Sequence, residues 1–130
     1  MALVEAGVVV LDCVEPTQLA TFYKELLDAE ETEATVDRVE IRGAGGTRMA
    51  FSRDALATPP SWPRPEESFH THLDFYVEDL DGAERRVVAL GGRPIEMRDP
   101  GGGLGERSYA DPAGHTFTLR RVIPAAPEPC

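Results

Sequence analysis

The sequence predicts an α+β protein made of two βαβββ modules in tandem, and an internal repeat is the main observation behind this prediction. An apolar, β-branched stretch over 8–15 leads into a helical pattern over 16–28, and the stretch over 72–79 leads into another over 80–90. The copies begin at residues 8 and 72, an offset of 64 residues in a chain of 130. Each copy continues into short alternating apolar runs, which predict three further strands.

The first module is predicted to span about 4–53. β-branched residues predict a strand from Val4 to Cys13. Pro16 stands where the first turn of a helix tolerates proline, and apolar side chains then recur at helical spacing to residue 28. Alternating apolar residues over 33–53 predict the remaining strands, with the glycines of 43–46 as a turn between two of them.

The second module is predicted to span about 69–122, after a linker over 54–68. Four prolines around the only tryptophan, Trp62, exclude a regular ladder or helix interior from this linker. The predicted elements of the module are a strand over 69–77, a helix over 79–90 ended by Gly91-Gly92, and strands near 93–98, 105–110 and 115–122. Residues 123–130 are expected to fray. The sequence therefore predicts one domain over 1–130.

Composition narrows the functional classes. A chain of 130 residues with 42% hydrophobic content suits a single core. We find no signal-peptide pattern and no apolar run of membrane-spanning length, and we therefore expect a cytoplasmic protein without a membrane partner. The net charge of −10 disfavours nucleic acid and favours a cationic or neutral small ligand. Cys13, expected on a packed strand face, and Cys130, at the last position, are expected to be reduced thiols.

Several motifs in order resemble the vicinal oxygen chelate superfamily, which includes glyoxalase I, bleomycin-resistance proteins and extradiol dioxygenases. The motifs lie at 11–16, 22–27, 72–80, 89–92 and 111–117. The resemblance covers about 4–122 and is closest to the small glyoxalase-like members. It implies that the eight strands form an incomplete barrel around a cleft, and that the protein is a homodimer.

The resemblance also implies four positions for metal ligands, one on each of four strands. Metal-dependent members carry histidine, glutamine or glutamate there, whereas this chain has Val8, Ser52, His72 and Thr118. Only His72 matches, and a catalytic divalent metal generally needs about three protein ligands. We therefore expect no cofactor. The alternative is a displaced divalent metal site, formed by His72 with His70, Asp74 and Asp12.

Strand alternation indicates which side chains line the cleft, because successive residues point to opposite faces of a sheet. In the strand over 69–77, Leu73, Phe75 and Val77 are expected to pack against the helix, which leaves the histidines, Asp74 and Tyr76 on the other face. The same parity predicts a ligand-binding set on the strands. Trp62 of the linker is added to it because its indole offers a flat apolar surface to a ligand, with core or interface packing as the alternative role. The predicted ligand-binding residues are Asp12, Ser52, Trp62, His72, Asp74, Tyr76 and Thr118.

Two further interpretations concern charged residues. Asp12 and Asp74 occupy equivalent positions in the two modules, so they form either a carboxylate pair for acid–base chemistry, a ligand contact, or ion pairs with Arg48 and Arg120. The residues Glu84, Arg85 and Arg86 are interpreted as a solvated helix face.

Three functional hypotheses follow from these observations. The favoured one is a metal-independent protein of the glyoxalase and bleomycin-resistance type that binds, and sequesters, a cationic or polar metabolite or antibiotic. The second is a lyase, isomerase or dioxygenase-like enzyme that uses His72 either with a displaced metal or as a general base. The third is a degenerate dimeric module that serves as a regulatory or partner domain.

Overall fold

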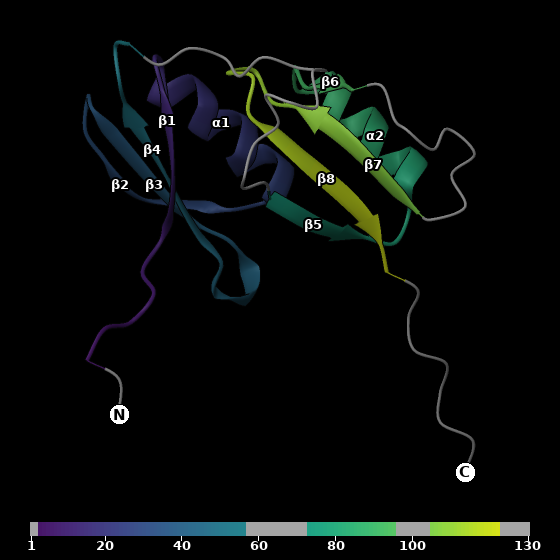
Figure 1. Ribbon diagram of the computed structural model, residues 1–130, viewed down its shortest axis with the longest axis horizontal. Helices are drawn as coiled ribbons and strands as arrows, with labels where there is room; N and C mark the ends of the chain where they lie inside the picture. Colours follow the sequence, from purple (N-terminus) through teal and green to yellow (C-terminus); the bar gives the residue numbers. More distant parts are fainter. Residues whose placement is uncertain (1–2, 57–72, 96–104, 123–130) are drawn as a thin grey trace. The chain divides into compact units, whose positions relative to one another are not determined.

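A computed structural model describes residues 3–56, 73–95 and 105–122, and the chain divides into two units, residues 1–59 and 60–130. Within the described ranges, each unit pairs one α-helix with one four-stranded sheet (Figure 1). This order of elements confirms the predicted α+β class with two tandem βαβββ-like modules. Among the described residues, no helix is both long and apolar enough to cross a membrane.

The first unit contains β1 (Val9–Cys13), α1 (Pro16–Leu27), β2 (Glu30–Ala34), β3 (Arg38–Arg42) and β4 (Arg48–Arg53). Its sheet, which we call sheet A, has the strand order β1-β4-β3-β2. β1 runs parallel to β4, and the other pairs are antiparallel. The glycine-rich segment Ala44–Gly46 forms the expected turn between β3 and β4, as a short 3₁₀ helix.

Helix α1 packs on one face of sheet A. Pro16 takes the first helical position, and Asp28 ends the helix in the left-handed conformation with φ of 51°. Leu19, Phe22 and Tyr23 are buried on the helix, and the Tyr23 ring stacks on Phe51 of β4 with 5.5 Å between ring centroids. The core of this unit therefore lies between α1 and the β3–β4 pair.

The second unit contains β5 (Leu73–Val77), α2 (Leu80–Ala89), β6 (Arg93–Pro94), β7 (Glu106–Ala110) and β8 (Thr116–Arg121). Its sheet, sheet B, has the order β5-β8-β7-β6, which repeats the pattern of sheet A (Figure 1). Asp79 caps α2 by accepting a hydrogen bond from the Gly82 amide at 3.1 Å. Gly91 follows the helix with φ of 107°, which agrees with the predicted stop signal.

Three element boundaries differ from the sequence prediction. The first strand begins at Val9 rather than Val4, and Val4 is 83% exposed, because β-branched composition alone does not supply a ladder partner. β2 begins at Glu30, ahead of the apolar pattern, because pairing with β3 extends to the Glu30–Arg42 register. β6 is described only at Arg93 and Pro94. The predicted residues 69–72 and 96–98, most of the linker and the tail lie outside the described ranges.

Candidate functional site

Each sheet has one face that carries no helix, and polar side chains gather there. On sheet A we define the helix-free face by Val10 and Asp12 of β1, Arg48, Ala50 and Ser52 of β4, and Arg38, Glu40 and Arg42 of β3. The residues between them, among them Met49 and Phe51, are buried toward α1. In register, Asp12 is opposite Ser52, which is in turn opposite Arg38.

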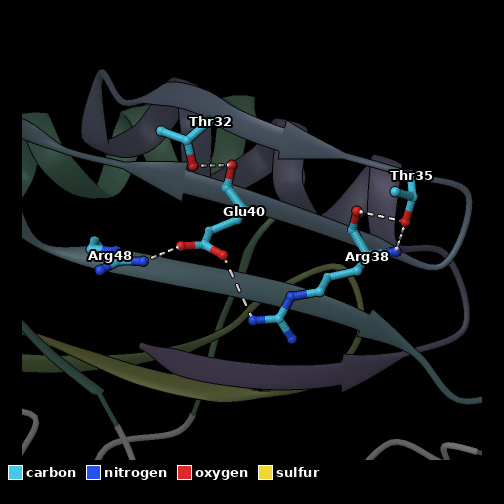
Figure 2. A network of polar contacts seen from close by, with 5 residues as sticks. All are labelled: Thr32, Thr35, Arg38, Glu40 and Arg48. Atoms are coloured by element: carbon cyan, nitrogen blue, oxygen red, sulfur yellow. Dashed lines mark hydrogen bonds and ion pairs between the residues drawn. The ribbon is translucent and has the colours of Figure 1, made fainter. Parts of the chain in front are cut away.

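An ion-pair network occupies this face of sheet A. Arg48 Nη2 donates a hydrogen bond to Glu40 Oε1 at 2.7 Å, and Arg38 Nη2 lies 3.7 Å from Glu40 Oε2 (Figure 2). The hydroxyl of Thr32 donates to the backbone carbonyl of Glu40 at 3.2 Å, from the neighbouring strand β2 (Figure 2). One nearly buried carboxylate therefore lies between two guanidinium groups, which are 50% and 36% exposed at Arg48 and Arg38.

The hydrogen bond from Arg48 holds the pKa of the Glu40 carboxyl below its ordinary value of 4.5, against the opposing effect of burial. The charges of Arg48 and Arg38 act in the same direction as the hydrogen bond. Glu40 is therefore ionised at neutral pH, and the three groups together carry a charge of +1.

The helix-free face of sheet B consists of Asp74 and Tyr76 of β5, Thr118 and Arg120 of β8, and Glu106 and Ser108 of β7. The hydroxyls of Ser108 and Thr118 are hydrogen-bonded at 3.1 Å. Arg120 Nη1 lies 3.7 Å from Asp74 Oδ2, and Arg120 Nε lies 3.4 Å from Glu106 Oε1. Here one guanidinium lies between two carboxylates, the reverse of the arrangement on sheet A.

The predicted ligand-binding residues fall into three groups. Asp74, Tyr76 and Thr118 share the helix-free face of sheet B, where Asp74 and Thr118 are opposite each other in register. Asp12 and Ser52 are opposite each other on sheet A. His72 and Trp62 lie outside the described residues, as does His70.

The predicted ion pair of Arg120 with an aspartate is present, with Asp74. Arg48 pairs with Glu40, a partner that the repeat of the two modules does not predict. The signal was available, because Glu40 lies between the apolar residues Val39 and Ile41 and must therefore face away from α1. The hypothesis of an Asp12–Asp74 pair joins the two units and stays a prediction.

The interpretation of residues 84–86 as a solvated face is wrong for Glu84. The hydroxyl of the buried Tyr109 on β7 donates to Glu84 Oε1 at 2.8 Å, and Arg107 Nη1 lies 3.7 Å from Glu84 Oε2. Burial raises the pKa of the Tyr109 phenol, and the hydrogen bond to Glu84 acts in the same direction. Arg107 also pairs with Asp81 at 2.9 Å, so polar contacts attach α2 to the sheet beside the apolar core.

The model of the glyoxalase-like domain matches residues 8–120, which is most of the chain and both units. The chain belongs to the glyoxalase-like domain family. This result confirms the expected membership of the vicinal oxygen chelate superfamily. A search of curated proteins finds none that matches.

Several solved structures share this fold. The fosfomycin resistance protein FosX from Listeria monocytogenes, complexed with Mn(II) and sulfate, is 17% identical with a TM-score of 0.70, over 95% of this chain and 94% of that chain. A glyoxalase/bleomycin resistance protein/dioxygenase family enzyme from Burkholderia phytofirmans PsJN is 14% identical with a TM-score of 0.65, over 88% and 96%. The protein SMU.1112c is 25% identical with a TM-score of 0.65, over 91% and 98%.

The donor set of this glyoxalase-like chain does not fit the metal positions that the superfamily implies. Val8 offers no donor, and Ser52 and Thr118 offer neutral hydroxyls, of which Thr118 is already hydrogen-bonded to Ser108. Within residues 3–56, 73–95 and 105–122, no three His, Cys, Asp or Glu side chains gather to hold a metal ion. His72, the one match to those positions, is outside these ranges.

Proposed function

We propose that this chain is a metal-independent, small-molecule-binding protein that sequesters a cationic or polar metabolite or antibiotic. The helix-free face of sheet B carries the proposal, because an aromatic ring there is exposed beside an excess of carboxylate. Tyr76 is 72% exposed, and its register neighbour Arg120 lies within ion-pair distance of both Asp74 and Glu106. The charges of Asp74, Glu106 and Arg120 sum to −1.

The chemistry of this face suits a ligand with a ring and a positive or hydroxyl group. An exposed tyrosine ring stacks on planar ligands and attracts cations through its π face, by about 0.5–2 kcal/mol. Glu106 pairs with Arg120 through one carboxylate oxygen, and an ionised carboxylate has about four lone-pair sites, so Glu106 can also accept hydrogen bonds from a ligand. Thr118 and Ser108 add hydroxyls in the row next to Tyr76.

Metal independence is part of the proposal, and the chemistry of the donor positions supports it. A valine at one position and hydroxyls at two others leave too few strong donors for a divalent ion, whether or not His72 is available. Asp12, Ser52, Trp62 and His72 are proposed as further ligand contacts. The homodimer and the cytoplasmic location implied by the resemblance and composition remain proposals, and light scattering on the purified protein tests the first.

Thermal melts of the purified protein with a panel of cationic aromatic and polyhydroxylated compounds test the binding function. A ligand present at 100 times its Kd stabilises the folded state by about 2.7 kcal/mol, which is a clear shift in melting temperature. Tyr76→Ala is expected to abolish the shift, and Tyr76→Phe, which keeps the ring, is expected to retain it. Shifts that survive Tyr76→Ala and Asp74→Asn unchanged would remove sheet B from the binding site.

Elemental analysis and melts with nickel, zinc, manganese and iron(II) test metal independence. The expected result is no stoichiometric metal and the same melting temperature with and without each ion. Stoichiometric metal, with stabilisation that His72→Ala abolishes, would contradict the proposal and make a metal-dependent enzyme the better account.

A further inference from the structure

The charge pattern of sheet A is the reverse of that of sheet B, although the two sheets are repeats of one another. On sheet A two guanidinium groups share one carboxylate, whereas on sheet B two carboxylates share one guanidinium. The first group carries +1 in a chain whose net charge is −10. The group of Arg48, Glu40 and Arg38 therefore attracts anions, and the acids elsewhere on this face, Asp12 on β1 and the glutamates of β2, confine this attraction to the surroundings of Arg48.

Glu40 holds the Arg48 side chain in place without using up its hydrogen-bonding capacity. The carboxylate takes one donor, Nη2, at 2.7 Å, and the guanidinium has five N–H groups in a rigid plane. Arg48 is still 50% exposed, whereas the Glu40 side chain is only 10% exposed. Glu40 is thus the buried partner of the pair. Arg48 is the exposed partner, and the ion pair fixes the orientation of its remaining N–H donors.

A like-charged neighbour gives a second indication that Arg48 takes an anion. Arg42 on β3 is directly opposite Arg48 on β4, and like charges in this position destabilise a sheet. Glu30 of β2 is opposite Arg42 on its other side, and Glu40 is diagonal to Arg48 but shared with Arg38, so these two acids offset part of the repulsion. An oxyanion bound at Arg48 would relieve it further.

The surroundings of Arg48 restrict the side from which a ligand approaches and the kind of ligand. Glu30 and Glu33 of β2 are opposite Arg42 and Glu40, so they repel an anion from the β2 side of the sheet. On the β1 side the exposed apolar neighbour is Val10, which is 41% exposed and is opposite the buried Ala50; Asp12 lies further along β1, in register with Ser52. A ligand there meets a guanidinium and aliphatic surface together.

We propose that the Arg48 end of the helix-free face of sheet A is a binding subsite for small organic acids, in which Arg48 holds a carboxylate or phosphate group and the apolar body of the ligand lies against Val10. Arg38 contributes a second positive charge to this subsite, and Glu40 is the positioning residue. None of these residues is a proposed contact of the cationic or polar ligand, and the two ligands have opposite charge.

Titration of ¹⁵N-labelled protein with benzoate at low ionic strength, followed by NMR, tests this proposal. The expected result is saturable shifts of the amides of β4 and of Val10, absent with the uncharged analogue benzyl alcohol. Arg48→Gln is expected to raise the Kd about tenfold or more, the usual effect of losing a hydrogen bond to a charged group. Arg48→Lys keeps the charge but loses the planar fork, and is expected to fall in between.

Arg53→Gln is the matched control, because Arg53 is an exposed arginine of the same strand with the opposite parity, in register with Cys13. It removes the same charge from β4 and is expected to leave the benzoate Kd within about twofold, by the weak effect of an exposed charge. Equal losses in Arg48→Gln and Arg53→Gln, or shifts with benzyl alcohol that match those with benzoate, would overturn the subsite.

Inorganic phosphate separates the two parts of the ligand. It is expected to compete with benzoate but to bind more weakly, because it lacks an apolar body; equal affinity would refute the role of Val10. Benzoate binding that persists in Tyr76→Ala while the cationic panel fails would leave this subsite standing and reject the proposed function of sheet B.

Discussion

Replacement of Tyr109 by phenylalanine measures how strongly a single polar contact attaches helix α2 to sheet B. The Tyr109 side chain is fully buried, and its hydroxyl donates to Glu84 Oε1 at 2.8 Å. A hydrogen bond to a charged group contributes about 1.5–3 kcal/mol. Glu84 is 37% exposed, so water replaces part of what is lost, and we expect a cost of about 1 kcal/mol.

Urea denaturation gives the free energy of unfolding of the wild type and the variant, with Tyr76→Phe as the control. Tyr76 is 72% exposed, so deletion of its hydroxyl is expected to change stability by less than about 0.5 kcal/mol. Combining Tyr109→Phe with Glu84→Ala, which removes the acceptor, completes a double-mutant cycle, in which we expect a coupling energy of about 1 kcal/mol. A coupling energy near zero, or equal losses for the two tyrosines, would refute the assignment of Glu84 as the partner of Tyr109.

Three further predictions concern charge, backbone and core. The folded state lowers the pKa of Glu40, so the ionised group stabilises the protein at pH values above its unfolded pKa, and this stabilisation is lost as the pH falls through the folded pKa. Glu40→Gln is therefore expected to be less stable than wild type at pH 7. The difference between the urea midpoints of the two proteins is expected to narrow at pH 3. Gly91→Ala, at φ of 107°, is expected to cost about 1 kcal/mol or more, whereas Gly43→Ala, at φ of −91°, is expected to be near neutral in the same melts. Phe117→Ala removes a fully buried ring that stacks on Tyr109, and it is expected to lower the free energy of unfolding by about 3–5 kcal/mol. Phe75→Ala removes a half-buried ring and is expected to lower it by less. Equal losses for the two variants would contradict this account of the core.

Local signals in the sequence were enough to predict the kind and order of the elements. Pro16 marks the first turn of α1, and Gly91 lies just past the end of α2, where only a residue tolerant of positive φ is unstrained. The strand that begins the first unit was predicted five residues too long, because β-branched residues such as Val4 favour a strand only where a neighbouring strand accepts their hydrogen bonds.

The charged faces were harder to predict than the elements. Strand parity correctly separates Met49 and Phe51 from Arg48 and Ser52, but it does not say which acid partners Arg48. Asp12 was the natural candidate from the repeat, whereas Glu40 lies diagonally across one strand pair. Glu84 is predicted to be solvated for the same reason, since its partner Tyr109 is 25 residues away in sequence.

The sequence by itself determined that this chain is a tandem βαβββ protein of the glyoxalase-like family. Those properties depend on hydrophobic period, turn residues and residue identity, which are local and additive along the chain. Only the tertiary structure decided that Glu40 lies between two arginines on sheet A and that Arg120 lies between two acids on sheet B. Such pairs depend on strand register and on which side chain reaches across it, and a shift of one residue would turn every side chain of a strand to the other face.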